Sequence, residues 1–392
     1  MAGLRKGAQI MRGHIRRRGE RSWELKYDVG TDPRTGRRVT KFVSFKGNKR
    51  EAQAELVRLM DTVRRGEHVD PSKLSMSEFL DRWEQGWAAL HVGPATRERY
   101  VGLLALHVRP HIGASSLHRL QPVHLAELYA KLLEKGVSAG TIKDVHQVIH
   151  KALTVAVEWS LLSRNPAAIA RPPKVQTREI EIITVEQAQR ILQCLRGRAL
   201  YPIIALALAT GMRRGELLAL RWGDVDLDAR RIQVERSLEQ TKAGLRSKEP
   251  KTKHGRRSIK ISPSVVAELK AHWAQQQAHR LKLGLGRAGD GDLIFPSWDG
   301  APRSPGATTV EWKRALAEFK LPAVSLHALR HTHASQLIAA GMDPVAISRR
   351  LGHASPTITL GIYGHLFENS DDRAAEIIEA AFGQTFTNEN VR

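Results

Sequence analysis

A proline-rich, charged stretch at residues 170–179, ARPPKVQTRE, divides this chain and excludes one continuous core. Adjacent prolines remove backbone donors and favour an extended chain, so neither a helix nor an inner strand continues through them. Asn165 and Pro166 already end the helical pattern that precedes this stretch. We therefore interpret residues 164–179 as an interdomain linker and expect the parts on either side to fold separately.

The first 68 residues have the pattern of a small β-sheet with one helix. Trp23, Leu25 and Tyr27 alternate with charged residues, as in a strand that has one buried face. The pattern predicts strands at residues 13–18, 22–29 and 38–45. A helix follows from Asn48 and is closed by Gly66.

Residues 74–163 show helical periodicity throughout. In the last segment, apolar residues recur at spacings of three and four, which predicts one buried stripe. The stripe consists of Ile142, Val145, Val148, Ile149, Ala152, Leu153 and Ala156. Ser75 or Ser77 can cap the first helix and Thr96 the second, and Pro122 is placed to open the third.

The residues after the linker, 180–385, have a mixed pattern, and residues 386–392 form a tail. We predict an antiparallel pair of strands at 231–236 and 256–261, joined by a basic hairpin. The predicted helices span 184–196, 202–209, 213–220, 263–283, 308–320, 327–341, 344–351 and 371–382. The fold class expected for the chain is multidomain and mainly α-helical with small β-sheets. The sequence holds no nucleotide-binding glycine loop, so nothing indicates nucleotide hydrolysis.

A net charge of +22 and a sequence pI near 10.5 favour a polyanionic partner. Each lysine or arginine docked on a phosphate releases condensed counterions, so nucleic acid is the first candidate. A merely solvated basic surface is the plain alternative. A membrane surface is another, but no basic amphipathic helix with a large aromatic face supports it.

The cysteine content and the apolar runs bear on location. The single cysteine, Cys194, excludes an internal disulfide and a multi-cysteine zinc site. No secretory segment is visible, so we expect a reducing cytoplasm. The longest apolar run, residues 203–209, is too short to span a bilayer.

Six residues of types suited to a phosphodiester occur in order along the second half of the chain. They are Arg213, Lys251, His327, Arg330, His353 and Tyr363. Arginine forks can hold a phosphate in two places, imidazoles and an amine can move protons, and a phenol can attack phosphorus. A phenol has a pKa of about 10, so nearby cations or proton transfer must activate it. The set predicts DNA strand transfer without a metal ion.

Each of these residues also has a plain structural interpretation. A lone tyrosine in a helix is usually core, and His327 and His353 can simply sit at helix ends. Arg213 and Glu216 can form an ordinary helical ion pair worth a few tenths of a kcal/mol. The PKTKHGRR run can be a solvated loop. Order and spacing together, rather than any single residue, favour the catalytic interpretation.

The segments ATGMRRGELLALRWGDVD, LHALRHTHAS and LGHASPTITLGIYGH resemble the signature boxes of the tyrosine recombinase, or phage integrase, family. His353 and Tyr363 have the ten-residue spacing that this family uses. The resemblance implies a catalytic domain at 180–385 and a helical core-binding domain at 74–163. It also implies an arm-type DNA-binding domain at 1–68, for which a dimerisation or capping module is the alternative.

The resemblance also implies a role for each residue. Tyr363 would be the nucleophile, forming a 3′-phosphotyrosyl link and releasing a 5′ hydroxyl, while Arg213 and Arg330 hold the phosphate. His327 and His353 would assist proton transfer. Lys251 would be the general acid, although Lys248, Lys253 and Arg256 share its presumed hairpin. Glu216 would orient Arg213.

Further expectations concern DNA, partners and cofactors. The residues expected to contact DNA are Arg16, Arg17, Arg18, Arg37, Arg38, Lys253 and Arg256. The resemblance implies double-stranded attachment sites, a homotetramer and strand exchange through a Holliday junction. It allows a DNA-bending host protein and a directionality factor, and it implies no metal, ATP or other cofactor. We expect viral or prophage integration in a bacterial cytoplasm, near the nucleoid.

Three other functions remain open at this stage. A chromosome or plasmid dimer resolvase belongs to the same class, although the extra basic N-terminal module favours an integrase. A non-catalytic DNA-binding regulator with the same fold is opposed by the complete catalytic set. A metal-dependent nuclease is opposed by the lack of grouped acidic ligands.

Overall fold

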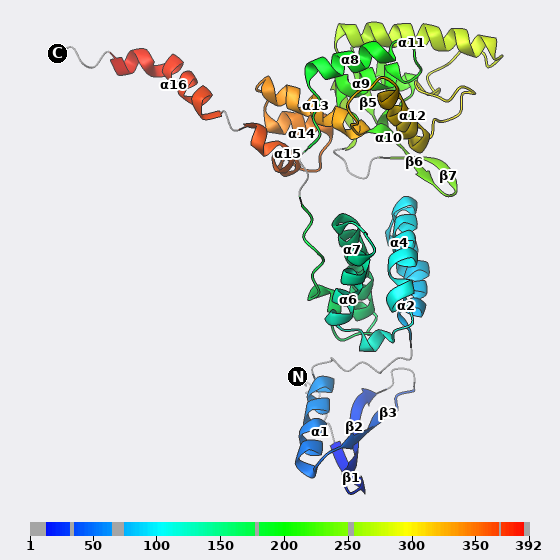
Figure 1. Cartoon of the computed structure of the whole chain (residues 1–392), viewed down its shortest axis with the longest axis vertical. Coiled ribbons are helices and arrows are strands. Elements are labelled where there is room, and N and C mark those ends of the chain that lie inside the picture. The colour runs from blue at the N-terminus through cyan, green and yellow to red at the C-terminus, as the bar shows by residue number, and fades with distance from the viewer. Residues whose placement is uncertain are drawn as a thin grey trace, which may run out of the picture. The chain divides into compact units, whose positions relative to one another are not determined.

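The computed structural model describes residues 13–31, 35–64, 74–176, 180–249, 255–367 and 370–387. The chain divides into two compact units, Met1–Gln176 and Thr177–Arg392. Helices dominate both units, and the described residues form three small sheets (Figure 1). The fold class predicted from the sequence is therefore confirmed.

The N-terminal part of the first unit is a three-stranded antiparallel sheet covered by one helix. Its elements are β1 (Gly13–Gly19), β2 (Ser22–Thr31), β3 (Arg38–Lys46) and α1 (Lys49–Arg64), with strand order β1-β2-β3. Leu25 and Tyr27 of β2 are buried under α1, as their alternation predicted. The Asn48 side chain caps α1 by accepting from the Glu51 backbone N–H at 2.9 Å.

The rest of the first unit is helical. Its α-helices and its π-helical turn are α2 (Met76–Trp83), η1 (Glu84–Ala88), α3 (Ala89–His91), α4 (Pro94–His107), α5 (Arg109–Ile112), α6 (Pro122–Glu134) and α7 (Ala139–Glu158), of which η1 is the π-helical one. The short 3-10 turns are η2 (Leu117–Arg119) and η3 (Pro166–Ala168). The whole predicted stripe on α7 is buried, in one core with Phe79 and Trp83. Fully burying such a side chain contributes roughly 1.5–3 kcal/mol, so this stripe holds the helices together.

The helix starts were predicted with mixed success. Ser75, rather than Ser77, caps α2 and forms a reciprocal pair of hydrogen bonds with Glu78. Thr96 was predicted to cap the next helix, and this prediction is wrong. Pro94 begins α4 two residues earlier, because proline at the first helical position needs no N–H partner and already has a helical φ.

The second unit packs most of its helices around one large apolar core. The helices are α8 (Val185–Leu195), α9 (Tyr201–Thr210), α10 (Arg214–Leu218), η4 (Trp222–Asp224), α11 (Pro263–Lys282), α12 (Pro305–Glu318), α13 (Leu326–Ala339), α14 (Pro344–Leu351), α15 (Pro356–Tyr363), η6 (Gly364–Phe367) and α16 (Ser370–Thr387). α15 was not predicted as a separate helix. α12 begins three residues before its predicted start, because Ser304 caps it and Pro305 opens it.

The described strands of the second unit form one three-stranded sheet and one two-stranded hairpin. β4 (Val225–Asp226), β5 (Arg231–Val234) and β8 (Arg257–Lys260) form one sheet in the order β4-β5-β8. β6 (Ser237–Thr241) and β7 (Gly244–Lys248) follow β5 and precede β8 in the sequence, and they form a separate two-stranded hairpin. The two strands predicted at 231–236 and 256–261 are confirmed, each in shorter form.

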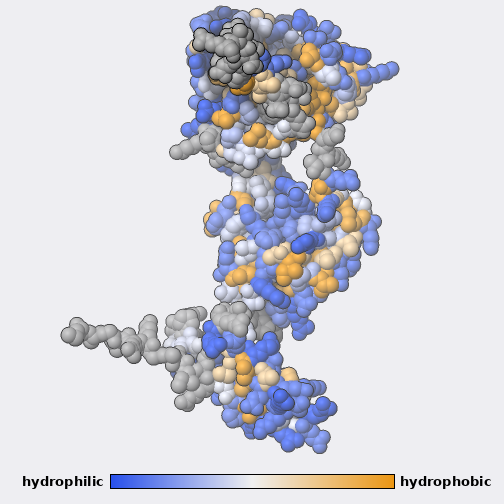
Figure 2. Space-filling model, turned by 90° about the vertical axis from the view of Figure 1, so that its left-hand side faces the viewer, coloured by the Kyte–Doolittle hydropathy of each residue, from blue (hydrophilic) through white to orange (hydrophobic). Residues whose placement is uncertain are grey.

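A smaller apolar cluster lies beside the large core and involves α13, α14 and α15. Its buried members are Ala334, Ile338, Ile347, Leu351 and Tyr363. Elsewhere, hydrophilic residues cover most of the face drawn in Figure 2, with smaller groups of hydrophobic residues between them. No helix among the described residues is long and apolar enough to cross a membrane.

Candidate functional site

Residues that are far apart in the sequence line one cavity of about 500 Å³ in the second unit. The start of α10, the end of β7, the first turn of α13 and the loop after α14 all contribute to its wall. Its polar lining residues include Arg213, Glu216, Lys248, His327, Arg330 and His353. Four of the six predicted catalytic residues therefore share one cavity, together with Glu216.

Arg330 is the most deeply buried cation among the described residues that line the cavity. Its side chain from α13 is 2% exposed and donates to the carbonyls of Gly211 (2.7 Å) and Leu351 (2.8 Å). Burial, aided by the charge of Arg213, lowers the pKa of Arg330 to about 9, so the guanidinium is still protonated at neutral pH. Two of its five N–H donors are used by the two carbonyls, and the others remain for an anion.

Glycine is required where Arg330 is held. Gly211 ends α9 with φ +65°, the left-handed conformation that glycine adopts at little cost. A Cβ added there would lie 2.7 Å from the His333 ring and 2.8 Å from the Leu351 side chain. Any larger residue at this position would displace the carbonyl that receives Arg330.

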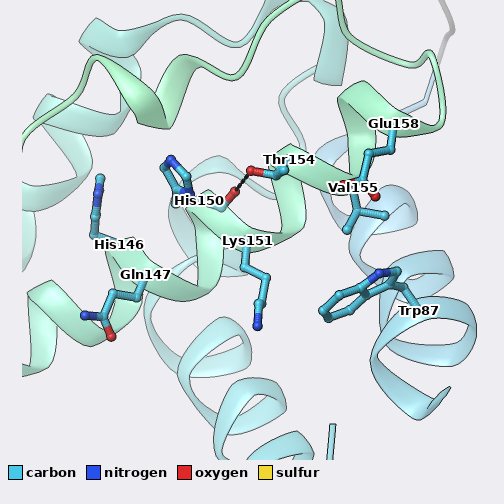
Figure 3. A pocket seen from close by; sticks show the side chains of 8 residues that line it. All are labelled: Trp87, His146, Gln147, His150, Lys151, Thr154, Val155 and Glu158. Atoms are coloured by element: carbon cyan, nitrogen blue, oxygen red, sulfur yellow. Dashed lines mark hydrogen bonds between the residues drawn. The ribbon is translucent and has the colours of Figure 1, made fainter. Parts of the chain in front are cut away.

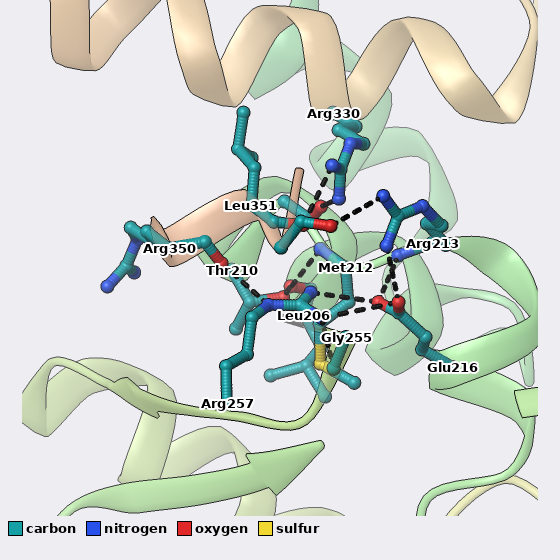
Figure 4. A network of polar contacts seen from close by, with 12 residues as sticks. Leu206, Thr210, Met212, Arg213, Glu216, Gly255, Arg257, Arg330, Arg350 and Leu351 are labelled. Atoms are coloured by element: carbon teal, nitrogen blue, oxygen red, sulfur yellow. Dashed lines mark hydrogen bonds and ion pairs between the residues drawn. The ribbon is translucent and has the colours of Figure 1, made fainter. Parts of the chain in front are cut away.

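Arg213 stands on the open side of the same cavity. It precedes the first residue of α10, and its side chain is 39% exposed. One terminal nitrogen donates to the Gly352 carbonyl at 2.9 Å and the other to Glu216 at 2.8 Å. The two arginines thus point toward the same backbone turn at residues 351–352 (Figure 4).

Glu216 is a buried carboxylate that joins α10 to β8. It is 3% exposed and accepts hydrogen bonds from Arg213 and from Arg257, whose Nη2 lies 2.8 Å from its Oε2 (Figure 4). Burial acts to raise the pKa of Glu216, but the Arg257 and Arg213 bonds and charges prevail and lower it. Glu216 is therefore more than the surface ion pair that its i, i+3 spacing also allowed.

Arg257 was not identified from the sequence, although a signal was present. In a strand, alternate residues face the same side, and Arg257 alternates with the buried Ile259 of β8. An arginine on the buried side of a strand needs a carboxylate partner, and Glu216 supplies it. Its Nε also donates to the Arg350 carbonyl at 2.7 Å, which ties β8 to α14.

The two predicted histidines are both neutral at pH 7. His353 is buried, and its Nδ1 lies 2.8 Å from the Thr359 hydroxyl. Burial, with the charges of Arg330 and Arg213, lowers the pKa of His353 to about 4. His327, on the first turn of α13, is more exposed. The ring of His327 loses water on the side that faces the protein, and this desolvation lowers its pKa to about 4 as well. The nearby His331 acts in the same direction.

Tyr363 lies beside the cavity and is not among the residues that line it. It is the last residue of α15 and is 1% exposed within the small apolar cluster. Its hydroxyl lies 2.7 Å from Nδ1 of His331, a residue that was not predicted from the sequence. Burial raises the pKa of Tyr363 to about 12, against the opposing charge of Arg330.

The predicted general acid falls outside the described residues, because Lys251 and Lys253 lie in the stretch 250–254. Lys248, at the end of β7, lines the cavity and is paired with Glu239 of β6. Arg256 is exposed and pairs with Glu249 at 2.5 Å.

The arginines expected to contact DNA in the N-terminal module are exposed on its sheet. Arg16, Arg17 and Arg18 lie along β1, and Arg37 and Arg38 precede or begin β3. Two of them have acidic neighbours, since Arg18 pairs with Glu24 at 2.7 Å and Arg38 with Asp28 at 3.2 Å. Such exposed pairs contribute little to stability, so these side chains stay available to a phosphate.

A second cavity, of about 390 Å³, lies in the helical part of the first unit (Figure 3). Its lining residues come from η1 and α7 and include Trp87, His146, His150 and Lys151. The Lys151 ammonium lies 5.2 Å from the Trp87 ring centre, so the ring face already has a cation partner. Among the residues that the structure describes, no arginine or tyrosine lines this cavity.

The main cavity is suited to a tetrahedral anion. Two guanidinium groups fixed by backbone carbonyls present donors to it, and two neutral imidazoles can accept or donate protons. Among the described residues, no three histidine, cysteine or acidic side chains are grouped closely enough to hold a metal ion.

Comparisons with known proteins point to one family. The model of the phage integrase family matches residues 181–370. The XerC-like tyrosine recombinase of Caldanaerobacter subterraneus is 28% identical over 388 residues, covering 93% of this chain and 97% of that protein.

Two solved structures show the same fold. The Tn1549 transposon integrase in complex with transposon right end DNA has a TM-score of 0.66 and 24% identity, covering 78% of this chain and 99% of that one. The lambda integrase tetramer bound to a Holliday junction has a TM-score of 0.55 and 19% identity, covering 86% and 91%. This chain therefore belongs to the tyrosine recombinase, or phage integrase, family, and it is a site-specific recombinase that breaks and rejoins DNA.

Proposed function

We propose that Tyr363 attacks a phosphodiester held in the main cavity, forming a 3′-phosphotyrosyl link and releasing a 5′ hydroxyl. The observation that carries this proposal is the convergence of Arg213, Arg330, His327 and His353 on one cavity, with Tyr363 next to it. The link conserves the energy of the phosphodiester bond, so rejoining needs no ATP. The protons are moved by side chains rather than by a metal-bound water.

In this proposal, Arg213 and Arg330 bind the non-bridging oxygens of the phosphate. Negative charge grows on these oxygens as the phenol approaches, and preorganised donors stabilise that charge without having to reorient. The bonds to the carbonyls of Gly352, Gly211 and Leu351 supply the preorganisation. Neutral His327 and His353 then hydrogen-bond the phosphate and accept or return protons.

The leaving 5′ oxygen needs a proton, and we assign its delivery to Lys251. The basic hairpin supports this assignment, because Lys248 at the end of β7 already reaches the cavity three residues before Lys251. Glu216 holds Arg213 in place through the hydrogen bonds described above.

The substrate of the enzyme is double-stranded DNA, and we propose that it carries attachment sites of a phage or prophage. The N-terminal module supports an integrase rather than a dimer resolvase, because 18 lysines and arginines against 9 acidic residues give residues 1–70 a net charge of +9. In this proposal residues 1–68 bind arm-type sites. Residues 74–163 and 180–385, joined by the linker 164–179, bind the core site.

We propose that four copies act together on two DNA partners in the bacterial cytoplasm, near the nucleoid. The lambda integrase tetramer on a Holliday junction supports this assembly. On α16, the side chains of Ile377, Ile378 and Phe382 are each at least half exposed, which favours docking onto a neighbouring copy. A bending protein and a directionality factor are further proposed partners.

Two tyrosine variants test the assignment of the nucleophile. Tyr363→Phe is expected to bind DNA with near-normal affinity and to form no covalent adduct. Tyr201→Phe is the matched control, because Tyr201 belongs to the same unit and bonds to Glu268 instead; it should form adduct at the wild-type level. Adduct formation by Tyr363→Phe at the wild-type level would place the nucleophile elsewhere.

A further inference from the structure

The Tyr363 hydroxyl has a hydrogen-bond partner that the proposed reaction does not use. His331 Nδ1 lies 2.7 Å from it, and the two ring centres are 5.7 Å apart with planes at 64°. Tyr363 is fully buried and His331 is half-buried, so the bond is largely shielded from water. The surrounding cluster is otherwise apolar, and a hydroxyl there needs a polar partner.

His331 and Arg330 are adjacent on α13 but face different directions. Consecutive residues of an α-helix differ by about 100° around its axis. Arg330 points toward the carbonyls of Gly211 and Leu351 at the cavity, whereas His331 points toward α15 and meets Tyr363. The hydroxyl is thus held on a side of α13 that is next to the cavity and outside its lining.

His327 connects these two sides of α13. It lies one helical turn before His331, and their ring centres are 4.8 Å apart with planes at 89°. His327 also lines the cavity. The residue that holds the hydroxyl is therefore one helical turn along α13 from a residue that lines the cavity.

Helix α15 is attached to the site at two points. Thr359 bonds to Nδ1 of His353 at 2.8 Å, and Tyr363, four residues later, bonds to His331. Positions four residues apart lie on the same face of a helix, so both bonds hold the same face of α15. Movement of the hydroxyl into the cavity must therefore break the His331 bond, while the Thr359 bond can remain.

We propose that His331 is a positioning residue that holds the Tyr363 hydroxyl beside the phosphate cavity in the DNA-free chain, and that this bond breaks when Tyr363 engages the scissile phosphate. This inference rests on the proposed role of Tyr363 as nucleophile. It gives the chain a means of keeping the phenol away from non-cognate phosphates, since the arginine pair is already assembled without DNA.

The contact can be tested without DNA on the full chain labelled with 3-fluorotyrosine. The chain has five tyrosines, and the Tyr363 resonance is assigned with Tyr363→Phe. We expect His331→Leu to shift the ¹⁹F resonance of Tyr363 and leave the other four in place. His331→Asn should restore it, because the asparagine amide lies near the position of Nδ1. His279→Leu, on α11, is the control for loss of a histidine that does not contact Tyr363.

The role in positioning is tested by single-turnover cleavage of DNA that flanks the gene of this protein. Removing one neutral hydrogen bond from the state that precedes attack should speed cleavage about two- to twelvefold in His331→Leu. His331→Asn should cleave at the wild-type rate. If thermal melting shows that His331→Leu does not fold, His331→Gln replaces it, because its longer side chain carries the amide past Nδ1.

Two results would overturn the inference. An unshifted ¹⁹F resonance of Tyr363 in folded His331→Leu would mean that the bond is not made in solution. Cleavage slowed by about a hundredfold and not rescued by His331→Asn would make His331 part of the reaction rather than a holder of the hydroxyl. A wrong assignment of the nucleophile would be detected by a different result, namely a covalent adduct formed by Tyr363→Phe.

Discussion

At the scale of single residues, the site depends on what each side chain is bonded to before DNA arrives. Arg330 is fixed by carbonyls at the ends of α9 and α14. Arg213 is fixed by the Gly352 carbonyl and by the Glu216 carboxylate, so both forks are oriented before DNA binds. Preorganisation of this kind is what allows a donor to favour the transition state over the ground state.

Arg330→Ala is expected to lower the cleavage rate by about 10²–10³, equivalent to roughly 3–4 kcal/mol of transition-state stabilisation. Arg330→Lys should recover little of this, because an ammonium cannot bond two carbonyls and a phosphate in one plane. Single-turnover cleavage measures both rates. Arg198→Ala, which removes an exposed pair with Glu318, is the control and should stay near wild type. An Arg330→Ala rate within a few-fold of wild type would contradict the phosphate-binding role.

The residue types of the site were largely predictable, and their contacts were not. Spacing and flanking sequence pointed to Arg213, Arg330, His327 and His353, which the structure brings to one cavity. His331 follows Arg330 directly, but its role depends on which side of α13 faces α15, and no local pattern determines that. Lys251 stays a prediction, because it lies outside the described residues.

At the scale of elements, the buried histidine His333 connects α13 to α9 and α14. His333 Nδ1 donates to the Leu208 carbonyl of α9 at 2.8 Å, and its Nε2 accepts from Arg350 of α14 at 3.0 Å. Both ring nitrogens are therefore satisfied only in the neutral form. Burial, together with the charge of Arg350, lowers the pKa of His333 to about 4.

The free energy of unfolding should consequently depend on pH. Above pH 6.5 His333 is neutral in both states, so its contribution is complete. Between pH 6.5 and about 4 only the unfolded chain gains the proton. Stability then falls by up to about 1.4 kcal/mol per pH unit for this residue. His327 and His353 shift in the same direction.

Chemical denaturation from pH 7.5 to 4.5 measures this loss of stability, and His333→Gln should give a shallower slope. An NMR titration of the His333 ring, assigned with the same variant, checks the cause. A midpoint near 6.5 in the folded chain would contradict the account, because the neutral form would then have no advantage.

Elements were predicted well wherever one local signal was strong. The α7 stripe and the β2 alternation gave the buried faces correctly. The hairpin strands β6 and β7 are mostly polar, and Leu238 is their one buried residue, so they offer little alternation to read. The eight-residue α15 was missed because it is short and its apolar residues form no buried stripe, since Ile358 and Leu360 are exposed while Thr359 and Tyr363 are buried.

At the scale of the whole molecule, charge is distributed over both units. The first 70 residues carry +9 of the total net charge of +22. Binding through phosphates depends on salt, because each docked cation releases counterions. The division into two compact units at residue 176 lies inside the proline-rich stretch that the sequence marked as a linker.

Deleting residues 1–68 is expected to leave core-site cleavage near wild type and to weaken binding to long DNA. The plot of log affinity against log salt should also become less steep, since each lost phosphate contact removes about 0.9 from the slope. Replacing Arg16, Arg17 and Arg18 together by alanine separates charge from fold, and it should reproduce part of the change. Equal recombination and an equal slope after deletion would reduce the module to a structural cap.

The residue that becomes joined to DNA decides whether Tyr363 is the nucleophile. The wild-type chain is incubated in EDTA with a supercoiled plasmid that carries the DNA flanking its gene. The covalent adduct is then digested with protease and nuclease, and its peptide is identified by mass spectrometry. We expect a nucleotide linked through its 3′ phosphate to Tyr363. A nucleotide on any other residue, or an adduct that forms only when a divalent metal is restored, would contradict the proposed mechanism.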